Sequence, residues 1–95
     1  MKTRITCSEL GLYRHFKGST YRVLSIAYHS ETKEKLVIYQ LVKFGKNINP
    51  NTVWYKEGDV FARPYDMFFS EVDKEKYPEV KQLYRFERIK EGITW

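Results

Sequence analysis

The sequence predicts a mainly β fold. Aromatic residues make up 17% of the chain, and such rings prefer pleated, half-buried surfaces. Short apolar stretches with a two-residue period alternate with clusters of Gly, Pro and Asn, and no stretch has the pattern of a long amphipathic helix. Many short strands in 95 residues are typical of either a small single-domain SH3-like barrel or a strongly bent antiparallel sheet.

Residues 20–28 and 36–44 show the clearest strand pattern. In both, apolar side chains occupy the two alternating faces, which predicts central strands covered on both sides. In the first strand the two sets are Tyr21, Val23 and Ala27 against Leu24, Ile26 and Tyr28. The polar residues 29–35 have the length and chemistry of a hairpin loop between these strands.

The middle of the chain contains two shorter strands and one helical turn. Residues 52–55 are predicted as a short strand, and residues 60–63 form a second one after the turn at 57–59. Pro64 keeps the residue before it out of the helical region and suits a first helical position. One short helical or 3₁₀ turn is therefore predicted over residues 65–68.

The C-terminal third returns to an extended conformation. We expect residues 69–72 to be extended and residues 73–78 to form a turn or a short helix. Residues 81–89 alternate in character and are predicted to form the final strand. The sheet would then be completed by the end of the chain.

Length and cysteine content bound the domain organisation. A chain of 95 residues can bury one core without disulfides, so residues 10–95 are expected to form a single domain. Residues 1–9 form a basic arm that is either disordered or an edge strand. Cys7 is the single cysteine, as in a chain from a reducing compartment, and no apolar stretch is long enough to span a membrane. We expect a cytoplasmic protein with no membrane partner.

Positive charge is concentrated near the N-terminus. The net charge is +5, and the first 30 residues hold five Lys and Arg side chains against one acid, whereas residues 31–95 hold twelve against eleven. A local cationic surface suits phosphate, nucleic acid or an acidic protein patch. The alternative is a solvated basic surface that binds no polyanion.

A family resemblance covers residues 10–89. The positions that carry it are Gly11, residues 13–18, Tyr21, Val23, Leu24, Ile26, Ala27, residues 29–32, Glu34, Val37, Tyr39, Arg63, Pro64, Met67, Phe68, Glu71 and Val72. In this order they resemble the pattern of a bacterial family catalogued as domain of unknown function 1653. The resemblance implies a short β-rich protein and no assigned reaction. Relative to that pattern, extra residues stand between Gly45 and Phe61.

The two histidines are the candidates for acid or base catalysis. His15 and His29 are the only side chains with an unperturbed pKa near neutrality, and Glu31 or Glu34 could orient one of them. The alternative is structural: His15 packs between strands and His29 closes the hairpin. Two histidines, one cysteine and dispersed acids supply too few ligands in too loose a spacing for zinc, and no phosphate-cradling glycine loop is present. We expect no metal and no cofactor.

Arginines interleaved with aromatic residues make the better functional case. Guanidinium groups grip phosphates and neighbouring rings stack on bases, the combination with which small barrels bind single strands. We therefore expect a non-catalytic module that binds an anionic ligand or nucleic acid. A protein-binding module is the alternative, and a small enzyme is the third possibility. The candidate site consists of polar and amphipathic groups that a core would not demand: Tyr13, Arg14, His15, Lys17, His29, Glu31, Tyr39, Arg63 and Met67.

Overall fold

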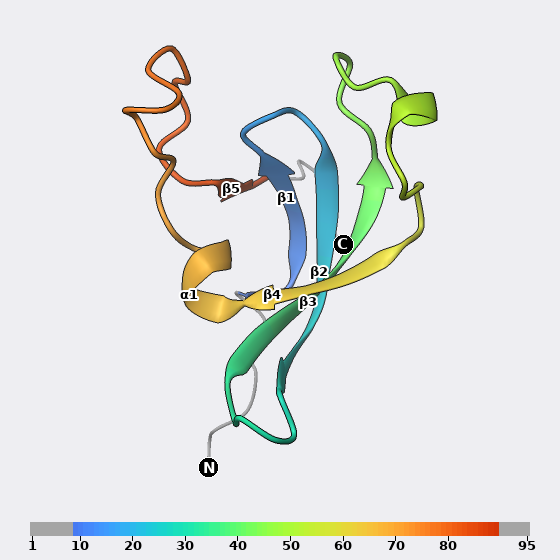
Figure 1. Ribbon diagram of the computed structural model, residues 1–95, viewed down its shortest axis with the longest axis vertical. Coiled ribbons are helices and arrows are strands. Elements are labelled where there is room, and N and C mark those ends of the chain that lie inside the picture. Colours follow the sequence, from blue (N-terminus) through green and yellow to red (C-terminus); the bar gives the residue numbers. More distant parts are fainter. Residues whose placement is uncertain (1–8, 90–95) are drawn as a thin grey trace.

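The computed structural model describes residues 9–89, which form one open, bent antiparallel sheet in the order β4-β3-β2-β1-β5 (Figure 1). The mainly β prediction is confirmed in its bent-sheet form, because the edge strands β4 and β5 do not pair within this range. No helix there is long or apolar enough to span a membrane. The predicted arm lies outside the described residues except for its last member, Glu9. The elements are β1 (Gly11–His15), β2 (Thr20–Tyr28), β3 (Lys35–Lys43), η2 (Pro50–Thr52), β4 (Val60–Pro64), α1 (Tyr65–Phe68) and β5 (Phe86–Arg88).

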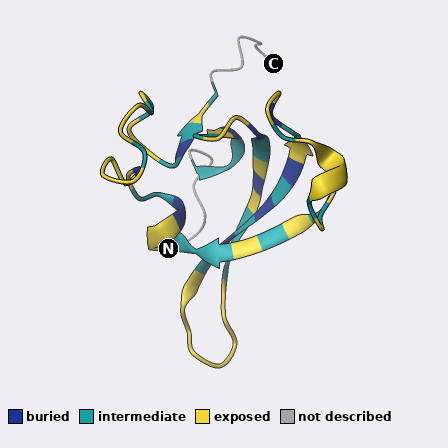
Figure 2. Cartoon of the chain, turned by 45° about the horizontal axis from the view of Figure 1, so that its top comes forward, coloured by how far each residue is buried: buried dark blue, intermediate teal, exposed yellow. Residues whose placement is uncertain are grey.

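β2 and β3 form the predicted hairpin, the longest pairing in the sheet. Tyr28 pairs with Lys35 next to the loop, and the backbone N–H of His29 donates to the carbonyl of Glu34 at 2.8 Å. The loop is exposed throughout and extends away from the rest of the molecule (Figure 2). The hairpin prediction is therefore confirmed, with β3 beginning one residue earlier than expected.

A β-bulge at Leu24 corrects the expectation that β2 is covered on both sides. Val23 pairs with Tyr39 and Ser25 pairs with Ile38, so Leu24 is an extra residue with no partner in β3. A bulge of this kind reverses the alternation of side chains along the strand. Val23 is buried and Ile26 packs against the same core, whereas Leu24 is 41% exposed. Val23 and Ile26, which the pattern assigned to opposite faces, thus serve one core.

The core lies on one face of the sheet and is covered by α1. Its buried residues are Tyr13, Val23, Val37, Tyr39, Phe68 and Phe86. Phe68 is fully buried and stacks on Phe86, with ring centroids 3.9 Å apart and an 8° angle between the ring planes. α1 covers the predicted turn at 65–68, and Pro64 stands at its N-cap rather than at the first helical position. Burial of a phenylalanine of this kind contributes roughly 2–3 kcal/mol.

Three strand predictions were wrong or too long. No strand forms at 52–55, where η2 ends at Thr52 and residues 53–55 are irregular. η2 forms because Asn49 accepts a hydrogen bond from the backbone N–H of Asn51 at 2.9 Å and Pro50 starts the turn. The predicted extended segment 69–72 contains only the isolated bridge between Glu71 and Tyr84. The final strand shortens to β5.

Candidate functional site

A cavity of about 410 Å³ opens beside the β1–β2 turn. Figure 1 shows segments 44–59 and 70–85 on either side of this turn. Side chains from all three regions line the cavity. One wall comes from the turn and β2, a second from the 44–59 segment with β4, and a third from the C-terminal segment. The lining residues are His15, Phe16, Lys17, Ser19 and Tyr21; Ile48, Tyr55 and Arg63; and Asp73, Lys76, Tyr77 and Arg85.

The β1–β2 turn is fixed by its own backbone and by the 44–59 segment. The N–H of Gly18 donates to the carbonyl of His15, and the N–H of His15 donates to the carbonyl of Ser19, both at 2.8 Å. Gly18 has φ +111°, a conformation that favours glycine. The hydroxyl of Ser19, which is 3% exposed, accepts from the N–H of Gly45 at 3.0 Å. This contact joins the turn to the loop that carries Ile48.

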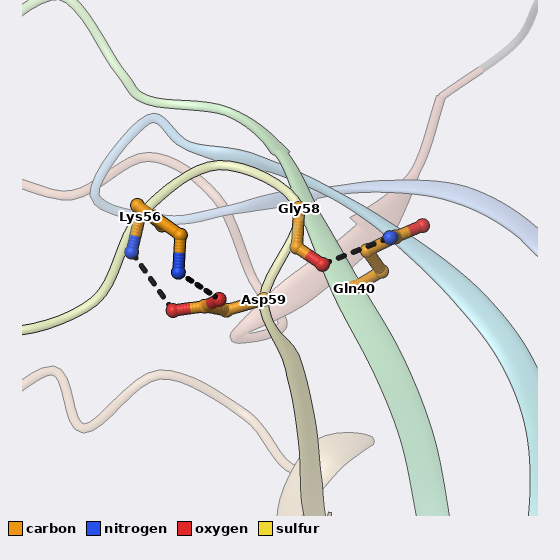
Figure 3. Close-up of polar contacts among 4 residues, drawn as sticks. All are labelled: Gln40, Lys56, Gly58 and Asp59. Atoms are coloured by element: carbon orange, nitrogen blue, oxygen red, sulfur yellow. Dashed lines mark hydrogen bonds and ion pairs between the residues drawn. The ribbon is translucent and has the colours of Figure 1, made fainter.

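A charged turn holds Tyr55 in the second wall. The backbone N–H and the ammonium group of Lys56 donate to the two carboxylate oxygens of Asp59 at 3.0 and 3.1 Å, and these hydrogen bonds lower the pKa of Asp59 (Figure 3). The side-chain amide of Gln40 donates to the carbonyl of Gly58 at 2.9 Å. This hydrogen bond attaches the turn at residues 56–59 to β3, and Tyr55 is the residue directly before that turn.

The third wall is built on a turn that Asp73 caps. The carboxylate of Asp73 accepts hydrogen bonds from the N–H groups of Glu75 at 3.0 Å and Lys76 at 3.3 Å, and its carbonyl accepts from Tyr77 at 2.9 Å. These bonds place Lys76 and Tyr77 at the cavity. They also occupy one oxygen of the single carboxylate that lines it.

Arg85 is held in place by its backbone, yet one of its side-chain nitrogens has no partner. The N–H of Arg85 donates to the carbonyl of Ser70, and its carbonyl accepts from the N–H of Phe16, both at 2.9 Å. The Nε atom is buried with no hydrogen-bond partner in the described chain. A buried N–H without an acceptor is unfavourable by about 1–3 kcal/mol.

Four cations line the cavity and have no ion-pair partner in the described part of the chain: Lys17, Arg63, Lys76 and Arg85. Within residues 9–89 the one ion pair joins Lys56 to Asp59, and neither of these two residues lines the cavity. The ammonium group of Lys17 instead lies 5.5 Å from the Tyr77 ring, and the guanidinium group of Arg63 lies 5.6 Å from the Phe86 ring. Like charges gathered around a hollow raise its positive potential and attract anions.

His15 is neutral at physiological pH. Burial, reinforced by the charges of Arg63, Lys17 and Arg85, lowers its pKa to about 4. Its Nδ1 accepts a hydrogen bond from the N–H of Lys17 at 3.1 Å, so the ring carries its proton on Nε2. Burial, with smaller contributions from nearby tyrosines, raises the pKa of Tyr21 to about 12. Both rings therefore offer hydrogen-bond donors to a ligand.

The structure brings together three of the nine predicted site residues, His15, Lys17 and Arg63, in this cavity. Tyr39 is linked to them because its hydroxyl accepts from Nε of Arg63 at 3.1 Å, although its ring is buried in the core. Tyr13 is also a core residue, with 5% of its surface exposed.

The other four predicted residues lie elsewhere, so the nine do not form one surface. Arg14 is exposed on the face opposite His15, because successive side chains of a strand alternate. His29 and Glu31 lie in the hairpin loop at the other end of the sheet, where Nδ1 of His29 accepts from the N–H groups of Glu31 and Thr32 at 3.1 and 3.3 Å. Met67 is half-exposed on α1.

The prediction omitted the C-terminal wall and the loop wall. Lys76, Arg85 and Tyr55 stand in stretches whose charge is nearly balanced along the sequence, so no local pattern marks them. These three residues can be recognised as cavity residues only from the fold, because it brings segments that are far apart in the sequence to the β1–β2 turn. Phe16 and Tyr21 were recognisable as rings that alternate with the N-terminal cations.

Two other hollows are less distinctive. The one beside β5 is lined by Glu87 and Arg88, and the one beside α1 by Glu34, Lys35 and Asp66, so neither carries an excess of positive charge. In the described part of the chain, no group of three or more His, Cys, Asp or Glu residues could hold a metal ion. The cationic cavity is therefore the candidate site.

Comparisons with known proteins bear on the fold and the family. A crystal structure of a DUF1653 protein from Bordetella bronchiseptica superposes with a TM-score of 0.61 at 23% sequence identity, covering 90% of this chain and 92% of that one. This similarity shows a shared fold. No curated protein matches the chain. The family model described as "protein of unknown function (DUF1653)" matches residues 11–88, and the chain therefore belongs to that family.

Proposed function

We propose that this protein is a non-catalytic binding module whose cavity takes an anionic ligand. The observation that carries the proposal is the set of four cations that line the cavity and form no ion pair within residues 9–89, with Asp73 as the one carboxylate in the lining. Holding like charges together opposes folding unless an anion neutralises them. A bound phosphate would supply the missing counterion.

The two arginines are suited to grip such an anion. A guanidinium group presents a planar set of donors that matches two oxygens of a phosphate or carboxylate. Arg63 is oriented by its hydrogen bond to Tyr39, and Arg85 has a buried Nε without an acceptor in the described chain. Lys17 and Lys76 add charge from the rim without fixed geometry.

We favour binding over catalysis because His15 is poorly placed as a base. A pKa of about 4 makes its ring a weak proton acceptor at neutral pH. Its Nδ1 is occupied by a backbone N–H rather than oriented by a carboxylate. His29 is engaged in the hairpin loop, far along the sheet.

A protein partner is the second candidate, and one observation favours it. Trp54 is 85% exposed, and Val60 nearby in sequence is 53% exposed. Tryptophan is enriched among the residues that contribute most to protein interfaces. A partner that covers Trp54 would bind beside the cavity. In either case we propose a cytoplasmic location, which the single cysteine supports.

Calorimetric titration with pyrophosphate, at low and moderate salt, tests the anion proposal. We expect salt-sensitive binding that weakens by about tenfold in Arg63→Gln, since hydrogen bonds to charged groups contribute about 1.5–3 kcal/mol. Arg14→Gln removes the same charge from the opposite face and is the matched control. Its affinity should stay within about twofold of the parent chain. An absence of binding, or an equal loss in both variants, would refute the proposal.

A further inference from the structure

The cavity is asymmetric in chemistry. Its cations come from the β1–β2 turn, β4 and the C-terminal segment, whereas the 44–59 segment contributes only Ile48 and Tyr55. That segment contains two lysines, Lys46 and Lys56, yet neither lines the cavity. A ligand that fills the space would meet cations from three parts of the chain and, from the 44–59 segment, one apolar and one aromatic side chain.

Tyr55 is fixed in this wall by other rings. Its ring centroid lies 5.8 Å from that of Phe44 and 5.5 Å from that of Phe61. Aromatic contacts of this kind hold a ring in one orientation. The hydroxyls of Tyr55 and Tyr21 form no hydrogen bond within residues 9–89, and the Tyr55 phenol is close enough to contribute to the raised pKa of Tyr21. The lining therefore also carries two phenol groups without a hydrogen-bond partner in the described chain, Tyr55 from the 44–59 segment and Tyr21 from β2.

We propose that the ligand is a nucleotide, with its phosphate among the cations and its base against Tyr55 and Ile48. This rests on the proposed anion-binding function. The shared chemistry is a phosphate monoester attached to a nucleoside, which is found both in free nucleotides and at the 5′-phosphorylated end of a single strand. The side chains proposed to contact the base, Tyr55 and Ile48, come from the 44–59 segment, whereas Lys17 and Lys76 come from the β1–β2 turn and the C-terminal segment.

The size of the cavity favours this ligand over a smaller anion. A volume of about 410 Å³ falls within the range of small-molecule sites. Inorganic phosphate or a sugar phosphate would make no stacking contact with the ring of Tyr55 and no apolar contact with Ile48. Stacking on an aromatic side chain is tolerant of base identity, because every base has a π-face.

Trp54 can distinguish a free nucleotide from the 5′-phosphorylated end of a single strand as the ligand. Its indole lies 5.2 Å from the Tyr55 ring, and the side chain is largely exposed. The next base of a strand could stack on it, whereas a free nucleotide seated against Tyr55 would not need it. Trp54→Ala should therefore weaken binding of a 5′-phosphorylated strand and leave binding of a mononucleotide unchanged.

The test compares AMP, UMP, ribose 5-phosphate and adenosine by calorimetric titration. Whichever of AMP and UMP has the higher affinity should bind about tenfold more tightly than ribose 5-phosphate, since stacking of the base on one ring is expected to give a factor of this order. Adenosine should bind much more weakly than AMP. Tyr55→Ala should remove the tenfold difference without changing the affinity for ribose 5-phosphate. Tyr28→Ala, which truncates an exposed tyrosine in the hairpin, is the matched control and should change nothing.

Three results would overturn the inference, and they are distinguishable. If ribose 5-phosphate binds as tightly as the nucleotides, the nucleotide assignment fails while anion binding stands. If adenosine binds as tightly as AMP, the phosphate assignment fails. If none of the phosphate compounds binds, both proposals fail. The comparison within the parent chain needs no variant, so it holds even if Tyr55→Ala does not fold. A 5′-phosphorylated oligonucleotide that binds more tightly than AMP, with a loss in Trp54→Ala, would support the strand as the source.

Discussion

Nε of Arg63 donates a hydrogen bond to the hydroxyl of Tyr39 at 3.1 Å, which joins the cavity to the core. Tyr39 is 5% exposed and pairs with Val23 in the middle of the sheet, whereas Arg63 lines the cavity. One cation of the site is thus oriented by a residue that cannot move without disturbing the core. The proposed binding of an anion would depend on this arrangement.

Tyr39→Phe tests that arrangement. The variant keeps the buried ring and removes only the acceptor of Arg63. We expect a loss of about 1 kcal/mol in the free energy of unfolding, because a partly buried side-chain hydrogen bond contributes about that much. Pyrophosphate affinity should fall by about twofold to fivefold, since Arg63 is less well oriented. Urea denaturation and calorimetry measure the two effects. Unchanged affinity would contradict the orienting role.

Arg85→Met should separate stability from binding. The substitution removes a charge from a cationic cluster and a buried Nε without an acceptor, while the methionine keeps much of the side-chain packing. We expect the free energy of unfolding to stay constant or rise by about 1 kcal/mol. Pyrophosphate affinity should fall about tenfold, since one charged donor is lost. A destabilised variant with normal affinity would show that Arg85 has a structural role instead.

His15 should make stability depend on pH. The unfolded chain has the ordinary histidine pKa near 6.5, whereas the folded value is about 4. Between these values the unfolded state binds the proton more readily, so the free energy of unfolding decreases as the pH falls. From about pH 7 to about pH 5 the loss attributable to His15 should be on the order of 1–2 kcal/mol.

His15→Gln provides the reference for this measurement. Carboxylates contribute to the acid dependence of both proteins, so the difference between the two denaturation profiles isolates the histidine. The profile of the variant should be flatter than that of the parent chain over this range. Parallel profiles would show that His15 does not carry the depressed pKa.

The sequence predicted those parts of the fold that rest on local alternation and turn chemistry. The β2–β3 hairpin follows from two apolar stretches around a polar loop, and α1 follows from Pro64. The bulge at Leu24 was not predictable, because a shift of register leaves no mark in composition. Because of this bulge, the sequence of β2 has the pattern of a strand with two buried faces, although β2 has only one.

The candidate site was predicted only where it is local. His15 and Lys17 belong to one turn, and Arg63 was added through the family resemblance. Lys76 and Arg85 reach the cavity through the Asp73 turn and through backbone hydrogen bonds to Ser70 and Phe16. Such long-range contacts have no periodicity in the sequence. His29 was included because its residue type suggested chemistry, although the structure engages it in the hairpin loop.

His29→Ala should affect the hairpin and leave the cavity unchanged. Its Nδ1 accepts two loop N–H groups, from Glu31 and Thr32. Loss of these exposed hydrogen bonds should reduce the free energy of unfolding by about 0.5–1 kcal/mol. Pyrophosphate affinity should stay within about twofold. A large loss of affinity would place the ligand at the hairpin rather than in the cavity.

Gly45→Ala should loosen the link between two cavity walls. A Cβ at Gly45 would lie 2.7 Å from the carbonyl carbon of Gly18, so one backbone must shift. We expect a loss of about 2 kcal/mol in the free energy of unfolding. Gly58→Ala adds the same methyl group at φ +99° with nothing within 4 Å, and should cost about 1 kcal/mol through backbone strain alone. A smaller effect at Gly45 than at Gly58 would contradict the close contact.

The most direct test of the central claim is a titration of the ¹⁵N-labelled protein with pyrophosphate, followed by amide chemical shifts. If the anion binds in the cavity, saturable shifts should be confined to its lining: residues 15–21, Ile48, Tyr55, Arg63, residues 73–77 and Arg85. The hairpin loop, residues 29–34, should not respond. Shifts centred on the hairpin or on the exposed face that carries Arg14, or no saturable shifts at all, would contradict it.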